Sequence, residues 1–273
     1  MRITGSNRVA KNVYSEIEAW TGVPFSLEAC KTTNNPNTVG AGKGVETAED
    51  WTNTRRKGSA SQGRDGTYLD NDENYLRYIL GVESINLIGV LSLAKVFDFT
   101  RYRSIFEIGC GDMAQAYVIH KLDPQIRYVA TDLDPYVIER CKKLSVLSGI
   151  DMRVLDVLKL PDMEIPFAGF DLLTSWGMEY ALDDAQLLRL FRMVRETGIP
   201  YLQCSATTIG LIQYARHWMD TRKRQALIDQ GKLRMSGWLR SVGKFRSLAR
   251  QAGLEVSIFG RFGYHFCILL TRP

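Results

Sequence analysis

Residues 104–114 read SIFEIGCGDMA, and this stretch decides the fold. The apolar residues before Gly109 are typical of a short buried strand, and an apolar pattern with helical spacing begins at Met113. Two glycines at the junction, Gly109 and Gly111, allow a sharp turn and let a ligand approach the backbone closely. The helix that follows presents free N–H groups and the positive end of its dipole to the same space. The stretch therefore predicts a strand–turn–helix unit that holds a nucleotide-type ligand.

Acidic residues accompany the ends of the first three predicted strands. Glu107 places a carboxylate near the end of an apolar strand, where it needs partners, either N–H groups of the neighbouring loop or a ligand. Asp132 and Asp134 follow the glycines by roughly twenty residues, where an acid can accept hydrogen bonds from ribose hydroxyls. Asp156 follows the third strand and could accept from an adenine amino group. The carboxyl edge of the sheet is therefore expected to be acidic.

Strands alternate with amphipathic helices after this unit. The further strands are predicted at residues 128–135, 152–156, 170–176, 200–206, 254–260 and 265–271. This pattern predicts an α/β fold with a mostly parallel seven-stranded sheet and helices on both faces. The last two strands are joined by the short turn 261–264, so they must form an antiparallel C-terminal hairpin.

Two additions to this core are expected. Residues 1–99 form a helical and loop-rich N-terminal extension, and the core, residues 100–273, is interrupted by a helical insertion at 207–238. Within the extension, the polar stretch 32–72 is either a lid over the site or a solvated connector. The insertion is either a cap helix or a helix packed on the core with a solvated back. Its basic residues either attract an anionic acceptor or form a solvated face: Arg216, Arg222, Lys223, Arg224, Arg234 and Arg240.

Composition excludes several classes of function. The 273 residues are 45% hydrophobic with a net charge of +5, which favours no partner by itself. The longest apolar stretch, 85–97, is too short for a membrane span, and the N-terminus lacks the apolar core of a signal peptide. The five cysteines are scattered without a metal-binding spacing, so a reducing cytoplasmic location without a metal is expected. A homodimer is left open.

The glycine pattern alone does not separate nicotinamide cofactors from other adenosine ligands. Three features favour a cationic sulfonium cofactor. An acid two residues before the first glycine is unexpected beside a pyrophosphate, because it would bring two anions together. Asp156 offers a further carboxylate, and the antiparallel hairpin is not part of a plain dinucleotide-binding fold. The alternatives are an NAD(P)-dependent oxidoreductase and a non-catalytic cofactor-binding regulatory protein.

At these residues the sequence resembles the class I S-adenosylmethionine-dependent methyltransferases. FEIGCGDM is similar to the family's first motif, TDLDP to its second-strand acid, LDVLKLP to its adenine-side loop and FDLLTSWGMEYAL to its fourth-strand motif. One departure is Met113, which stands where many members have a third glycine, so the loop must turn without it. The resemblance implies that the chain is a small-molecule methyltransferase, acting on oxygen, with S-adenosyl-L-methionine (SAM) as cofactor.

The resemblance also implies roles for individual positions. Gly109 and Gly111 would lie under the methionine part of the cofactor, with Glu107 ordering that loop. Further contacts are implied for the ribose by Asp132, for the adenine by Leu133, Asp156 and the Val157 N–H, and for the methionine end by Ser175 and Trp176.

The methyl acceptor and the catalytic base are less well defined by the sequence. The Asn/Asp-Pro-Pro-aromatic motif of nucleic-acid amino methylation is replaced by SWGM, so nucleic acid is not expected as a partner. The large additions favour a small-molecule, glycosyl or lipid-linked acceptor held away from water. Glu179 and Tyr180 follow the fourth strand, and His265 begins the last strand at the same rim, so these three are the candidates for a base.

Overall fold

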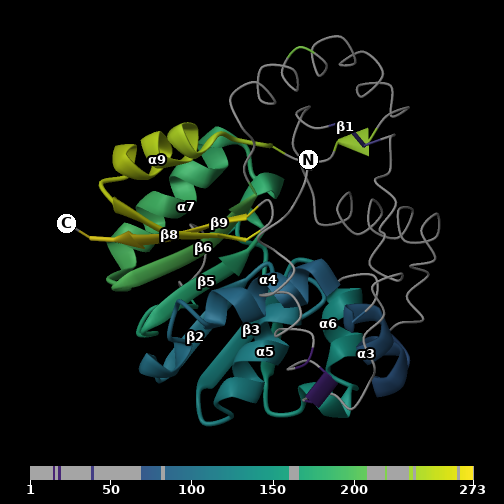
Figure 1. Cartoon of the computed structure of the whole chain (residues 1–273). Coiled ribbons are helices and arrows are strands. Elements are labelled where there is room, and N and C mark those ends of the chain that lie inside the picture. The colour runs from purple at the N-terminus through teal and green to yellow at the C-terminus, as the bar shows by residue number, and fades with distance from the viewer. Residues whose placement is uncertain are drawn as a thin grey trace.

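The computed structural model describes residues 69–80, 84–159, 166–207, 238–262 and 265–272, with eight further residues (15, 18, 19, 38, 39, 219, 234 and 235) (Figure 1). Most of the expected lid at 32–72 and most of the insertion at 207–238 therefore lie outside the described residues. In the described part of the chain, no helix has both the length and the apolar character needed to cross a bilayer.

A seven-stranded sheet forms the centre of the molecule, in the order β4-β3-β2-β5-β6-β9-β8. Six strands run parallel and β9 runs antiparallel to its neighbours β6 and β8. The strands are β2 (Ser104–Ile108), β3 (Arg127–Asp132), β4 (Asp151–Val154), β5 (Leu172–Trp176), β6 (Tyr201–Thr207), β8 (Glu255–Phe262) and β9 (His265–Thr271). The predicted mostly parallel sheet with an antiparallel C-terminal hairpin is confirmed.

Helices cover both faces of this sheet, as predicted (Figure 1). One face packs against α3 (Asp72–Leu80), α4 (Ser84–Ala94), α5 (Ala114–Leu122) and α6 (Pro135–Cys141). The other face packs against α7 (Asp184–Thr197) and α9 (Val242–Gln251). Helices α3 and α4 precede residue 100, yet their apolar side chains belong to the same hydrophobic core as those of α5. The N-terminal extension thus contributes directly to the core of the sheet.

Short 3-10 turns account for small differences from the sequence prediction. The helix expected after β3 ends at Cys141, and a separate turn, η3 (Ser145–Leu147), follows. At this turn the Val146 N–H donates to the Asp72 carboxylate of α3 instead of continuing a helical ladder.

The C-terminal turn is also tighter than the four residues predicted, because β8 extends to Phe262 and β9 begins at His265. Two more short turns are η2 (Phe99–Arg101) and η5 (Glu179–Ala181).

The carboxyl ends of the parallel strands meet at one rim, where ligands bind in open α/β sheets. A separate two-stranded sheet pairs β1 (Thr38–Val39) in parallel with β7 (Arg234–Met235). This pairing joins a segment of the N-terminal extension to a segment of the insertion (Figure 1).

Candidate active site

The turn after β2 contains three residues in the left-handed backbone region. Gly109, Gly111 and Met113 have φ values of 68°, 53° and 65°. The loop therefore turns without a third glycine, as expected, and Met113 itself adopts the left-handed conformation that a glycine would favour. Gly109 also has no space for a side chain, because a Cβ there would lie 2.3 Å from Cγ of Met178. Met178 belongs to the loop after β5, so the loops after β2 and β5 are in close contact.

Asp132, the last residue of β3, connects two loops of this rim. One carboxylate oxygen accepts from the Gly111 N–H at 2.9 Å, and the other accepts from the Asp134 N–H at 3.0 Å. A carboxylate offers about four acceptor sites in all. Asp134 caps α6 through its own bond from the Tyr136 N–H, at 3.0 Å. The buried carboxylate that orders the glycine loop is therefore that of Asp132.

Glu107 has different partners from those expected. Its side chain is only 1% exposed, and it accepts from the Tyr128 hydroxyl at 2.9 Å and from the Gln115 side-chain amide at 3.1 Å. Neither a loop N–H nor a ligand supplies these two bonds, which corrects the expectation from the sequence. Burial raises the pKa of Glu107 to about 8, even though the Tyr128 hydrogen bond lowers it. Glu107 is therefore neutral at pH 7.

A pH-dependent stability follows from this shift. Between about pH 4.5 and 8 the unfolded chain has lost the Glu107 proton while the folded chain retains it, so stability falls as pH rises. One group contributes at most about 1.4 kcal/mol per pH unit. We expect the free energy of unfolding of wild type, relative to Glu107→Gln, to decrease from pH 5 to pH 8 in urea titrations. A difference that is constant across this range would contradict a raised pKa at Glu107.

The expected adenine side of the site lies after β4. The Asp156 carboxylate accepts from the Leu158 N–H at 3.0 Å and lies 3.6 Å from Nζ of Lys159. Val157, the next residue along the chain after Asp156, and Leu133, which directly follows β3, are both half-buried. The Leu155 N–H donates to the Asp132 carbonyl at 2.9 Å, which brings the start of this loop to the end of β3.

Ser175 and Trp176 are separated by the sheet. Ser175 hydrogen-bonds to Cys204 on the face covered by α7, where burial raises the pKa of Cys204 to about 12. The Trp176 ring packs on the opposite face against Gly89 of α4, where a Cβ would lie 2.5 Å from Cζ2 of the indole. The two side chains therefore do not line one common wall, because neighbouring residues of a strand face opposite sides.

The three candidates for a base are at the same rim of the sheet. Glu179 is buried and Tyr180 is half-buried, and both lie in η5 directly after β5. His265 pairs in the β9 register with Thr207, the last residue of β6. Because β6 is the neighbour of β5, the backbone position of His265 is near the same edge, as predicted.

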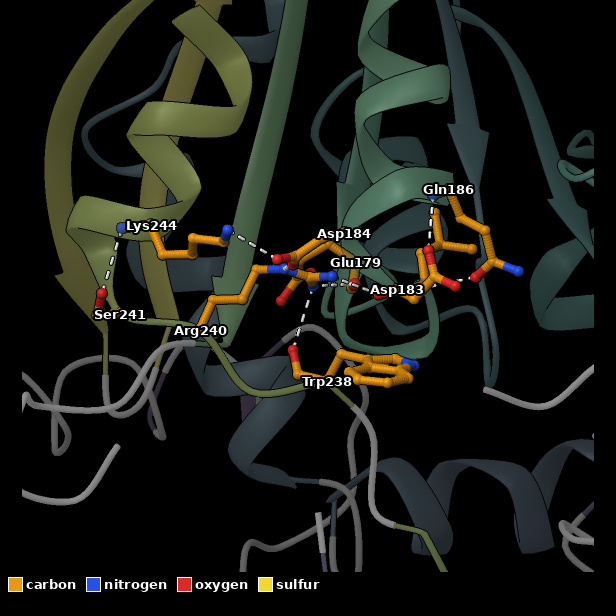
Figure 2. A network of polar contacts seen from close by, with 9 residues as sticks. Glu179, Asp183, Asp184, Gln186, Trp238, Arg240, Ser241 and Lys244 are labelled. Carbon is orange, nitrogen blue, oxygen red and sulfur yellow. Dashed lines mark hydrogen bonds and ion pairs between the residues drawn. The ribbon is translucent and has the colours of Figure 1, made fainter. Parts of the chain in front are cut away.

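Arg240 fixes the loop that carries Glu179 and Tyr180 (Figure 2). The residue is 3% exposed, and its guanidinium donates to the backbone carbonyls of Glu179 at 2.9 Å, Leu182 at 2.6 Å and Trp238 at 3.1 Å. It also donates to the Asp184 carboxylate at 2.8 Å. The Trp238 N–H in turn donates to the Tyr180 carbonyl. The chain that returns from the insertion is therefore bonded to the loop after β5.

Asp184 completes this network at the first turn of α7. Its second oxygen lies 2.8 Å from Nζ of Lys244 (Figure 2). Burial raises the pKa of Asp184, but the hydrogen bonds from Lys244 and Arg240 outweigh it, so the pKa is lowered overall. Arg240 neither attracts an acceptor nor joins a solvated face, which corrects the expectation for this member of the basic run. The sequence offers no periodicity that identifies it, because its partners come from a different segment.

Comparisons with known proteins identify the fold. No protein-family model matches the sequence, and no curated protein is found as a relative. The mitomycin 7-O-methyltransferase MmcR matches with a TM-score of 0.59 at 16% sequence identity, over 97% of this chain and 68% of that chain. Human N-acetylserotonin methyltransferase in complex with SAM matches with a TM-score of 0.53 at 17% identity, over 98% of this chain and 68% of that chain.

A third structure, PigF with S-adenosylhomocysteine (SAH), matches with a TM-score of 0.53 at 18% identity. That match covers 67% of this chain and 61% of PigF, so this chain spans less than two thirds of the PigF length. The chain has the fold of the class I SAM-dependent methyltransferases, as its motifs predict.

Proposed function

We propose that this chain is a SAM-dependent methyltransferase that acts on an oxygen atom of a small-molecule or glycosyl, natural-product-type acceptor. The observation that carries the proposal is the loop after β2, where three residues adopt the left-handed conformation and the Gly111 N–H is bonded to the strand-end acid Asp132. This loop lies at the carboxyl rim of a sheet whose fold is that of class I methyltransferases.

The cofactor would lie across the ends of β2, β3 and β4. In this proposal Gly109 and Gly111 contact its methionine part, and the Asp132 carboxylate at the end of β3 accepts from the ribose hydroxyls. Leu133 and Val157 flank the adenine, whose amino group donates to Asp156. Trp176 is the better candidate for the methionine end, because Ser175 is bonded to Cys204 on the other face.

For methyl transfer the protein mainly has to align the acceptor with the methyl group and remove the acceptor's proton. When bound, SAM supplies a methyl group already activated by its sulfonium. Transfer of this methyl group to the acceptor oxygen would leave the electron pair of the sulfur–carbon bond on sulfur and give SAH. The acceptor proton passes to a base, for which Glu179, Tyr180 and His265 are the candidates at the rim.

Two observations support a small acceptor. The pairing of β1 with β7 joins the N-terminal extension to the insertion, so the two additions are candidates for one shared cover over the pocket. The names of MmcR and human N-acetylserotonin methyltransferase specify acceptors that are small molecules. We infer that the acceptor of this chain is also a small molecule.

Calorimetric titration tests the cofactor part of the proposal. We expect SAH to bind and NAD to give no heat above dilution. Binding of NAD without SAH would instead favour an oxidoreductase. Binding of SAH without methyl transfer to a broad acceptor panel would favour a regulatory protein.

Asp132→Ala is expected to weaken SAH binding at least about tenfold, or about 1.4 kcal/mol, through the loss of charge-assisted bonds to the ribose. The matched control is Asp134→Ala, two residues away, which removes the cap of α6. This control should lose about 1 kcal/mol of stability but keep its SAH affinity. Equal SAH affinities in wild type and Asp132→Ala would contradict the placement of the ribose.

A further inference from the structure

The peptide unit between Asp112 and Met113 is held from both sides. Its N–H donates to the Cys110 carbonyl at 2.9 Å, and its carbonyl accepts from the Tyr75 hydroxyl at 2.8 Å. The next carbonyl, that of Met113, accepts the first helical bond of α5 from the Tyr117 N–H at 2.8 Å. Both peptides that flank Met113 are therefore fixed by hydrogen bonds.

Met113 needs such support because its backbone conformation is unfavourable for a side chain. It is the one non-glycine residue with positive φ among those that the structure describes. Its side chain is fully buried in the core beneath α3, α4 and α5. To relax to negative φ, the peptide between Asp112 and Met113 would have to turn, which would break its bonds to Cys110 and Tyr75. Strained residues persist where the surrounding contacts over-determine them in this way.

Tyr75 is itself held firmly. It lies in α3 with 0% exposure, and its ring packs edge-on against that of Tyr117, with centroids 6.4 Å apart. Three residues earlier in α3, the Asp72 carboxylate accepts from the Ser145 hydroxyl and the Val146 N–H of η3. Asp70, two residues before the start of the helix, pairs with Arg140 of α6 at 2.7 Å. Helix α3 thus connects the loop after β2 to the elements that follow β3.

We propose that Tyr75 is a positioning residue for the cofactor loop. Its hydroxyl holds the Asp112 carbonyl, and through it the left-handed turn at Met113, so that the backbone from Gly109 to Met113 keeps the geometry that binds the cofactor. The N-terminal helix α3 therefore sets the cofactor affinity of a loop that has methionine in place of glycine. The part of this inference that concerns SAM affinity rests on the proposed function.

The first test compares Tyr75→Phe with Tyr117→Phe. Each variant removes one hydroxyl from the same ring pair, but only the Tyr75 hydroxyl contacts the loop, since no bond from the Tyr117 hydroxyl is found in the described part of the chain. In Tyr75→Phe the loop populates its binding geometry less, and the SAH dissociation constant should rise about tenfold. Tyr117→Phe should change it less than about twofold. Equal affinities in wild type and Tyr75→Phe would overturn the proposal.

Amide hydrogen exchange gives a readout that needs no cofactor. In Tyr75→Phe the Met113 N–H should exchange at least about tenfold faster, while the amides of β6 and β9 keep their wild-type rates. Faster exchange throughout the sheet would mean general destabilisation and would overturn a specific role for Tyr75. If wild type failed to bind SAH, the proposed function would fail, and the exchange rates would still decide whether Tyr75 holds the loop.

A rescue experiment separates positioning from simple loss of a contact. Glycine adopts positive φ without strain, so in a Met113→Gly background the Tyr75→Phe change should alter SAH affinity less than about twofold. An undiminished tenfold effect in that background would show that Tyr75 acts by another route. If the cavity left by Met113→Gly prevents folding, the comparison of Tyr75→Phe with Tyr117→Phe by exchange and calorimetry decides the question.

Discussion

Arg240→Met is expected to lower the free energy of unfolding by about 3–5 kcal/mol, because it removes the buried donor of three backbone carbonyls. Methionine can occupy much of the same space, but it leaves the carbonyls of Glu179, Leu182 and Trp238 without their guanidinium donor. The Asp184 carboxylate also loses its shielded partner. Urea unfolding followed by circular dichroism measures the loss.

Lys244→Met is the matched control, because Lys244 pairs with the other oxygen of the same Asp184 (Figure 2). The side chain of Lys244 is 41% exposed, whereas that of Arg240 is 4% exposed. Solvent screens the exposed pair, so this substitution should lower the free energy of unfolding by less than about 1 kcal/mol. Similar losses in the two variants would contradict a special role for the buried guanidinium.

Gly109→Ala is the second large effect. A Cβ at this position would lie 2.3 Å from Cγ and 2.6 Å from Cβ of Met178, so the loop after β5 would have to move. The positive φ of 68° adds backbone strain. We expect about 2–5 kcal/mol of lost stability from the two effects together. SAH affinity should fall at least about tenfold, because the displaced backbone lies in the proposed cofactor loop.

Gly169→Ala separates strain from crowding. Gly169 has a φ of 81°, but nothing lies within 4 Å of its ideal Cβ position. The substitution should therefore cost only the roughly 1–2 kcal/mol of left-handed strain and leave SAH affinity unchanged. Equal losses of stability in Gly169→Ala and Gly109→Ala would show that the contact with Met178 adds nothing to the backbone strain.

The sheet could be predicted from the sequence because its strands are short apolar runs separated by amphipathic helices. The strand from 104 to 108 and the glycines after it also marked the rim where a ligand could bind. The hairpin followed from a connection too short for a parallel crossover. These features depend on local pattern, which a single sequence carries in full.

The contacts that define the site could not be predicted in the same way. Glu107 was expected to meet loop amides or a ligand, but its partners are Tyr128 and Gln115, and burial leaves it neutral at pH 7. Glu107 therefore does not supply the negative charge that was expected at the carboxyl edge of the sheet. Arg240 belonged to a run of basic residues whose other members are typical of a surface. Only the three-dimensional arrangement shows that it is enclosed by carbonyls.

The bonds of Arg240 and Trp238 also bear on how sequences with this fold could diversify. The chain leaves the sheet at the end of β6. Before α9 begins, Trp238 is hydrogen-bonded to the Tyr180 carbonyl and to the Arg240 guanidinium. Residues 208–237 are thus bracketed by two anchored ends, and a longer or shorter segment between fixed ends changes the entropy of loop closure only slowly. We therefore expect changes of length between these two ends to leave the stability of the seven-stranded sheet nearly unchanged.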